Sequence, residues 1–135
     1  MPPEQVRKGS PQDWLLHANS DLELARTGKS PRVLFETLCF HAHQAVEKAI
    51  KAVLVAHKAP IIKSHNIGAL IKLLPDDIHR IPELKEAMSL TDYAVLSRYP
   101  GDLEPVTEKD YKEAVELAEK VIQWAERSIS KPSPG

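Results

Sequence analysis

The residues best suited to chemistry in this chain gather in one stretch, which begins at position 41. At about 100° per residue, an α-helix here places the imidazole, amide, carboxylate and ammonium groups on one arc. We call this set the polar strip, and it comprises His41, His43, Gln44, Glu47, Lys48 and Lys51. Histidine titrates near neutral pH, and lysine and glutamine donate hydrogen bonds, so these residues suit phosphate binding or acid–base chemistry. The sequence therefore predicts that the polar strip forms the wall of a groove.

Charge is uneven along the chain, although the formal net charge is only -1. Residues 41–80 contain six Lys or Arg against three Asp or Glu, whereas residues 101–129 contain four against eight. Lys58, Lys63 and His65 follow the polar strip in this basic half, which favours a phosphate-bearing ligand. The alternative is an ordinary solvated helix face whose lysines pair with Glu47. The near-zero total excludes a general attraction to nucleic acid or membranes, so any such site must be local.

A second group of candidate residues is Arg98-Tyr99-Pro100, at the end of an expected helix. An arginine and an aromatic ring at a helix terminus can hold a phosphate and stack a base together. In the alternative interpretation, Arg98 satisfies the last helix carbonyls while Tyr99 closes one end of the bundle. The sequence leaves both interpretations open.

The histidines and the single cysteine do not form a recognisable metal motif. His41 and His43 point about 200° apart on a helix, so they cannot bind one ion as neighbours. Cys39 and His43 have the i, i+4 spacing of zinc ligands and of a Cys–His nucleophile pair, but no further ligands follow at a known spacing. Cys39 also lies on the apolar arc, where a thiolate is disfavoured. We predict no metal site, no cofactor and a buried Cys39.

Phe40 is an exposed aromatic residue among the polar side chains of the same expected helix. An aromatic anchor ringed by polar groups is typical of a protein interface. We therefore predict a symmetric dimer with Phe40 and Gln44 at its interface. A purely structural role, in which the polar strip is buried between subunits without a ligand, stays open beside a binding role.

Five helices are expected to position these groups, each bounded by capping residues, prolines or glycines. The expected ranges are 14–27 with Asp13 as N-cap, 31–57 with Ser30 as N-cap, a short helix capped by Ser64 or Asn66, 82–97, and a last helix capped by Thr107. In the second of these, alanines at positions 42, 45, 49 and 52 let another helix approach closely. The sequence therefore predicts that this helix is the centre of the fold.

The predicted fold is all-α, an up-and-down bundle of four long helices plus one short helix. The 135 residues suffice for one domain, expected at 13–130 between tails at 1–12 and 131–135. The N-terminus lacks the apolar stretch of a signal peptide, and no apolar run reaches the about 20 residues that cross a bilayer. We interpret the chain as a cytoplasmic protein with no membrane partner.

The chain resembles HEPN domains, the small helical modules named for nucleotide binding in higher eukaryotes and prokaryotes. Five stretches carry the resemblance in order: DWLLHANSDLELAR, HAHQAVEKAIKAVL, KSHNIGALIKLL, LSRYPG and AVELAEKVIQWAERSI. The chain is most similar to the short prokaryotic form that resembles the partners of minimal nucleotidyltransferases, often in toxin–antitoxin-like pairs. The resemblance implies a homodimer built on a helix pair that includes the second helix.

The resemblance also implies where a ligand binds: the groove of Gln44, Glu47 and Lys48, with His65 and the Arg98-Tyr99 turn. Many HEPN domains are metal-independent RNases that use an Arg followed by a His after four to six residues. No Arg of this chain has a His at that spacing. The leading hypothesis is therefore a dimeric protein, non-catalytic or weakly catalytic, that binds a nucleotide, RNA or a nucleotidyltransferase partner.

An RNase toxin is the alternative function. In that case His41, His43 or His65 would be the acid–base groups, and Lys48 or Arg98 would stabilise the charge that develops on the phosphorane.

Overall fold

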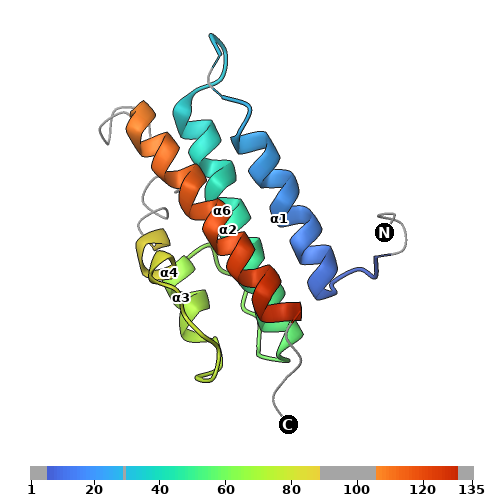
Figure 1. The fold of residues 1–135 in the computed structure, drawn as a ribbon. Helices are drawn as coiled ribbons and strands as arrows, with labels where there is room; N and C mark the ends of the chain where they lie inside the picture. The colour runs from blue at the N-terminus through green and yellow to red at the C-terminus, as the bar shows by residue number, and fades with distance from the viewer. Residues whose placement is uncertain (1–5, 29, 89–105, 131–135) are drawn as a thin grey trace.

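The computed structural model describes residues 6–28, 30–88 and 106–130. Its helices are α1 (Pro11–Ala25), α2 (Phe35–Ala56), α3 (Ile67–Lys72), α4 (Pro82–Ala87) and α6 (Glu108–Ser130) (Figure 1). The described residues contain no strand, only an isolated bridge between Ser30 and Val33. The prediction of an all-α fold is confirmed.

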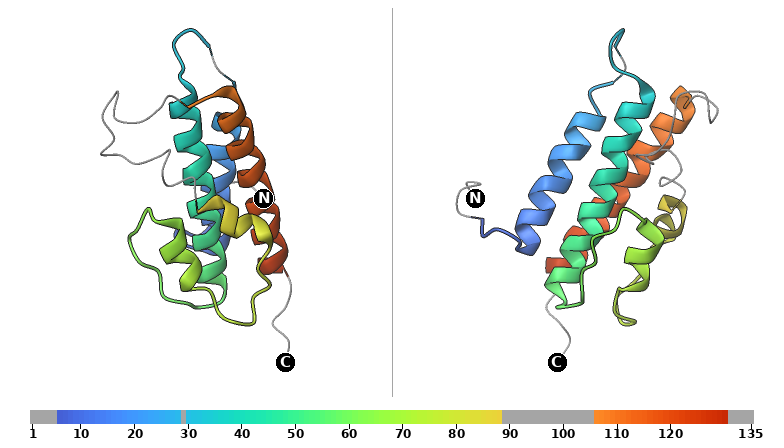
Figure 2. Two further views of the ribbon diagram at one scale, coloured as in Figure 1. Left: turned by 90° about the vertical axis from the view of Figure 1, so that its left-hand side faces the viewer. Right: turned by 180° about the vertical axis from the view of Figure 1, so that it is seen from behind.

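Helices α1, α2 and α6 lie side by side, and the short helices α3 and α4 pack beside them (Figure 2). Helix α2 contacts α1, α6 and α3, so it is the central element, as the sequence predicts. Ala42, Ala45, Ala49 and Ala52 are all fully buried, and their small side chains allow the close approach of neighbouring helices. Within the described residues, no helix is long and apolar enough to cross a membrane.

Helix α1 begins earlier than predicted. Its N-cap is Ser10, whose Oγ accepts a hydrogen bond from the Asp13 backbone N–H at 3.1 Å. The Asp13 carboxylate accepts from the Gly9 N–H at 2.9 Å, so Asp13 completes the cap from inside the first turn. The prediction of Asp13 as N-cap is wrong because Pro11 is tolerated in the first turn. The helix ends at Ala25, before the predicted Thr27.

Helix α2 begins later than predicted, at Phe35 instead of Pro31. The Val33 N–H donates to the Ser30 carbonyl at 3.1 Å. This three-residue spacing closes a turn rather than the first α-helical bond. Ser30 is therefore not the N-cap, and Leu34 occupies that position without a side-chain hydrogen bond. The end of α2 at Ala56 lies within one residue of the prediction.

The remaining helices agree with the sequence in part. Asn66 caps α3, and Thr107 and Asp110 form reciprocal 3.1 Å hydrogen bonds at the start of α6, as a capping box does. Helix α4 ends at Ala87 with Met88 as C-cap, well before the predicted Ser97. Residues 89–97 lie outside the described residues. The described part of the chain has three long helices, and a fourth stays a prediction.

Candidate functional site

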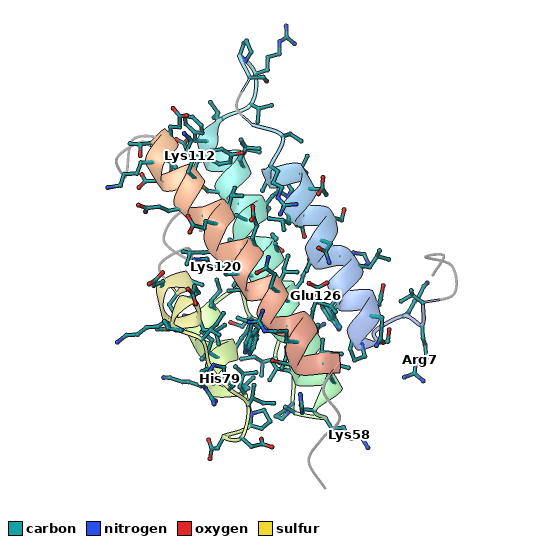
Figure 3. The ribbon with its side chains drawn as sticks, viewed as in Figure 1. Arg7, Lys58, His79, Lys112, Lys120 and Glu126 are labelled. Atoms are coloured by element: carbon teal, nitrogen blue, oxygen red, sulfur yellow. The ribbon has the colours of Figure 1, made fainter. Side chains whose placement is uncertain are left out.

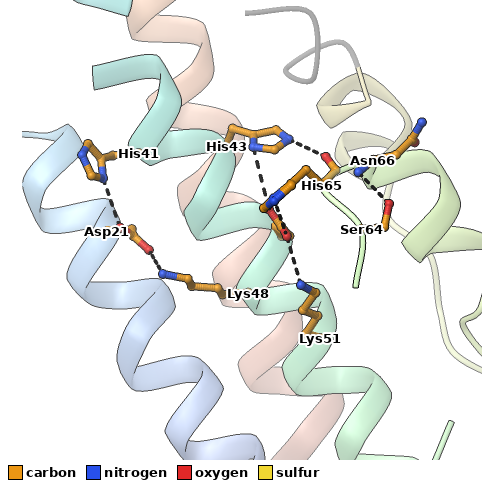
Figure 4. A network of polar contacts seen from close by, with 9 residues as sticks. Asp21, His41, His43, Lys48, Lys51, Ser64, His65 and Asn66 are labelled. Carbon is orange, nitrogen blue, oxygen red and sulfur yellow. Dashed lines mark hydrogen bonds and ion pairs between the residues drawn. The ribbon is translucent and has the colours of Figure 1, made fainter. Parts of the chain in front are cut away.

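The carboxylate of Asp21, on α1, contacts two members of the polar strip. The Lys48 Nζ donates to Asp21 Oδ2 at 2.6 Å, and His41 Nδ1 lies 3.1 Å from Asp21 Oδ1 (Figure 4). The Asp21 side chain is 14% exposed, and those of His41 and Lys48 are about a quarter exposed. We call these three residues the Asp21 cluster. It links α1 to α2 along the edge of the polar strip.

A second carboxylate, Glu47 on α2, lies at the centre of a similar arrangement. The Lys51 Nζ donates to Glu47 Oε1 at 3.0 Å, and the His65 Nδ1 lies 3.2 Å from the carboxylate oxygens. Only 2% of the Glu47 side chain is exposed, whereas 65% of the His65 side chain is. We call these three residues the Glu47 cluster. It links α2 to the segment that precedes α3 (Figure 4).

His43 lies beside the Glu47 cluster and is buried. Its Nε2 is 2.9 Å from the backbone carbonyl of His65, and its Nδ1 is 4.0 Å from Glu47 Oε2. Nδ1 has no hydrogen-bond partner among the described residues. Burial lowers the pKa of His43 below its ordinary value, against the opposing effect of the Glu47 charge and the carbonyl contact. His43 is therefore neutral at pH 7.

The prediction that His43 and Glu47 face a groove is wrong. The two residues are one helical turn apart, and that side of α2 packs against α3 and the segment before it. The other members of the polar strip are half-buried, and they recur every three or four residues: His41, Gln44, Lys48 and Lys51. The accessible part of the polar strip is thus a narrow band between α1 and the 57–66 segment.

The positive charge predicted for the polar strip is largely compensated. Lys51 pairs with Glu47, as the alternative interpretation of the sequence proposed, but Lys48 pairs with Asp21 on the neighbouring helix. Lys51 Nζ also lies 5.4 Å from the centre of the Trp14 ring, within the range of a cation–π contact. The lysine ammonium groups are therefore held in place rather than free to follow a ligand.

Sequence reasoning missed Asp21 and Trp14, although both contact lysines of the polar strip. They are seven residues apart on α1, so they lie on the same side of that helix. The sequence did contain a signal for the ion pair: the acidic Asp21 lies beside the apolar stripe of α1, and Lys48 and Lys51 lie beside the apolar stripe of α2. Pairing them requires the register between α1 and α2, which helix periodicity does not contain.

The interface residues predicted on α2 are less accessible than expected. Phe40 is half-buried rather than exposed, and its ring packs edge-to-face against His41 with centroids 5.4 Å apart. Gln44 is also half-buried. Arg98 and Tyr99 lie outside the described residues, so their part in a site stays a prediction.

The buried Cys39 and the cleft between α4 and α6 are less suited to a functional site than the polar strip. Cys39 is fully buried, as predicted, and the described residues contain no group of three His, Cys, Asp or Glu side chains that could hold a metal ion. A cleft of about 520 Å³ lies between α4 and α6, and Lys120 lies on its α6 side (Figure 3). Lys120 pairs there with Glu83 and Glu116. No residue of α2 lines this cleft.

Comparisons with known proteins agree with this fold. A family model described as HEPN domain matches residues 11–128. The crystal structure of TT1696 from Thermus thermophilus is similar, with a TM-score of 0.76, 28% identity, and coverage of 89% of this chain and 98% of that one. The structure of ST0689, an archaeal HEPN homologue, has a TM-score of 0.69 and 31% identity, and covers 90% of this chain and 98% of that one. No curated protein matches the chain.

Proposed function

This chain belongs to the HEPN domain family, whose members often have nucleotide- or RNA-related functions, and from that premise we propose that it is a dimeric module that binds a nucleotide or RNA. The ligand lies at the α3 edge of the polar strip, beside the dimer interface, with His65 as its main contact. Arg98 and Tyr99 are the contacts that the sequence adds to this site.

The observation that carries the proposal is the contrast within the Glu47 cluster. A buried carboxylate is costly, by several kcal/mol, unless hydrogen bonds and opposite charges compensate it. Glu47 has both, and one of its partners is a largely exposed imidazole. The cluster therefore fixes the His65 ring at the surface, where its outer nitrogen can contact a ligand. A neutral ring offers a hydrogen-bond acceptor, and a protonated ring offers a charged donor to phosphate.

The dimer is proposed on the narrow accessible band of α2. Gln44 lies in the middle of this band, and Phe40 lies one turn before it. Half-buried aromatic and amide side chains without a net charge are typical of an interface centre, where charged residues are depleted. Light scattering tests this part, because a monomer at all concentrations would contradict it.

A minimal nucleotidyltransferase in a toxin–antitoxin-like system is the second candidate partner. The observation in its favour is the compensation of Lys48 and Lys51 by Asp21 and Glu47. A polar surface with paired charges suits a protein partner better than a polyanion, whose binding depends on lysine and arginine charge. Co-expression of the two proteins followed by size-exclusion chromatography tests this candidate.

An RNase activity finds less support. Acid–base cleavage of RNA needs two titratable groups near one phosphate. His41 lies on the α1 side of α2 and His65 on the α3 side (Figure 4). A helix with its side chains is about 10 Å across, so the two rings of one subunit do not reach one phosphate.

The test is fluorescence anisotropy of a labelled single-stranded RNA titrated with the purified chain in chelator. We expect binding that His65→Ala weakens about fivefold, the loss of about one hydrogen bond. The control is His79→Ala, which removes an exposed histidine in the segment between α3 and α4 (Figure 3). Equal loss in both variants would contradict the proposal. The same samples on a denaturing gel report RNA cleavage, which would favour the RNase alternative.

A further inference from the structure

His65 is held by α2 at two points that are one helical turn apart. The His43 ring contacts its backbone carbonyl at 2.9 Å, and the Glu47 carboxylate contacts its ring Nδ1 at 3.2 Å. Figure 4 shows both contacts converging on the segment that precedes α3. This pair of contacts is unusual because one of the two residues that contact His65, His43, is itself a fully buried titratable group.

The partner of each nitrogen dictates where the hydrogens lie. A backbone carbonyl only accepts, so His43 must donate to the His65 carbonyl from Nε2. In the neutral ring, Nδ1 of His43 then carries a lone pair. That lone pair faces the Glu47 oxygen at 4.0 Å, and two acceptors form no hydrogen bond. His43 therefore does not compete with Lys51 and His65 for the Glu47 oxygens.

The contact with Glu47 fixes the hydrogen of the His65 ring in a similar way. An ionised carboxylate only accepts, so the His65 Nδ1 must carry a hydrogen. In the neutral ring, Nε2 of His65 then carries the lone pair. His43 and Glu47 thus act on two different parts of His65: His43 fixes its backbone carbonyl, and Glu47 fixes the hydrogen of its ring.

We propose that His43 is a positioning residue that, together with Glu47, holds His65 in the Nδ1–H tautomer and presents its Nε2 to ligands as a hydrogen-bond acceptor. An acceptor selects a ligand that donates, such as a ribose hydroxyl. Only this choice of ligand rests on the proposed function. The 2′-hydroxyl distinguishes RNA from DNA, so the site favours RNA over DNA of the same sequence.

The unpartnered nitrogen argues against a merely structural role for His43. A buried acceptor without a partner is destabilising, and a leucine would fill a core position on α2 without that cost. The ionisable groups near His43 in the described residues are Glu47 and Lys51 on α2 and His65 before α3. Protonation of His43 would add a donor toward Glu47, and would draw the carboxylate away from His65.

The first test is long-range ¹H–¹⁵N NMR of the histidine rings in the full chain without ligand, at a pH where the rings are neutral. We expect Nδ1–H for His65 and, from its contact with Asp21, for His41. We expect Nε2–H for His43 and for His57, whose Nε2 lies 3.2 Å from the Ser128 carbonyl. An Nε2–H tautomer for His65 in the wild type would overturn the inference, whatever the result with RNA.

The second test compares variants at two buried positions of α2. His43→Leu removes the donor to the His65 carbonyl and should mix the His65 tautomers, while His43→Gln keeps an amide donor and should restore them. Ile50→Val is the control, because it weakens the same helix at a fully buried position whose side chain makes no hydrogen bond to His65. A tautomer change of equal size in Ile50→Val would mean that His43 acts only through stability.

The third test measures the affinities of a single-stranded RNA and of the DNA of the same sequence by anisotropy. We expect about a fivefold preference for RNA, as one hydrogen bond provides, which His43→Leu and His65→Ala abolish. Equal affinities in the wild type would overturn the acceptor role. Absence of all binding, with the expected tautomers, would overturn the proposed function and leave the positioning role of His43 supported.

Discussion

The Asp21 cluster and the Glu47 cluster have the same chemical composition in different surroundings. Each consists of a carboxylate that pairs with a lysine and lies close to the Nδ1 of a histidine. All three members of the Asp21 cluster are partly accessible. In the Glu47 cluster, the carboxylate is buried and contacts the largely exposed ring of His65. The two clusters contain the same residue types, so their difference comes from burial. The partly accessible Asp21 cluster only links two helices, whereas the buried Glu47 carboxylate fixes the position of a side chain at the surface.

The largest difference between the clusters should appear in stability. Glu47→Ala leaves Lys51 and His65 without their buried partner, and we expect it to lower the free energy of unfolding by about 3 kcal/mol, as for other broken buried pairs. Urea denaturation measures this loss. Glu116→Ala, at an exposed carboxylate of α6, should have little effect. A loss in Asp21→Ala as large as that in Glu47→Ala would remove the distinction.

The second prediction concerns pH, through His43 beside the Glu47 cluster. Its pKa in the folded chain lies below the ordinary 6.5, so the unfolded chain binds the proton first as the pH falls. This residue's contribution to stability is complete above about pH 6.5 and is lost toward the lower folded pKa, by at most about 1.4 kcal/mol per pH unit.

Denaturation of the wild type and of His43→Leu between pH 5 and pH 8 tests this sign. The variant lacks the titrating group, so the stability difference between the two proteins should shift in favour of the variant as the pH falls. The matched variant His79→Leu, at an exposed histidine, should keep the wild-type slope. A parallel pH dependence in His43→Leu would contradict the prediction.

The third prediction compares the two exposed edges in RNA binding. His65→Ala should weaken binding about fivefold, whereas His41→Ala should change it less than twofold, because the His41 ring is less accessible and packs against Phe40. Anisotropy with one labelled RNA measures both. Arg98→Ala belongs in the same series, because we expect it to lose binding without a change in melting temperature. A stronger effect of His41→Ala would place the ligand on the α1 side.

The smallest expected effect is that of Asp21→Asn. The Asp21 cluster is partly solvated, so its loss should cost only about 0.5 kcal/mol and should shrink further at high salt. Thermal unfolding at low and high salt measures this difference. A salt-independent loss would show that the Asp21 cluster is effectively buried, as the Glu47 cluster is.

Local patterns predicted much of the fold. Thr107 was readable as the cap of α6 because its partner Asp110 lies within one turn. The central place of α2 was readable because its alanines recur at helical spacing. The start of α2 could not be read from the sequence. The residues Ser30-Pro31 are compatible with a helix N-cap and also with the turn that the Val33 N–H closes on the Ser30 carbonyl.

The sequence by itself determined which segments contain helices, which face of α2 is apolar and that the chain resembles HEPN domains, since these depend on residue type and on spacing within one segment. Only the tertiary structure decided which polar groups of α2 are buried and which carboxylate each lysine meets. Helix periodicity places Glu47 and Lys48 on one broad polar arc, about 100° apart, but α3 and the segment before it cover the first, and Asp21 of α1 meets the second. Burial and pairing depend on contacts between segments far apart in the chain, and those contacts set the chemistry of His65.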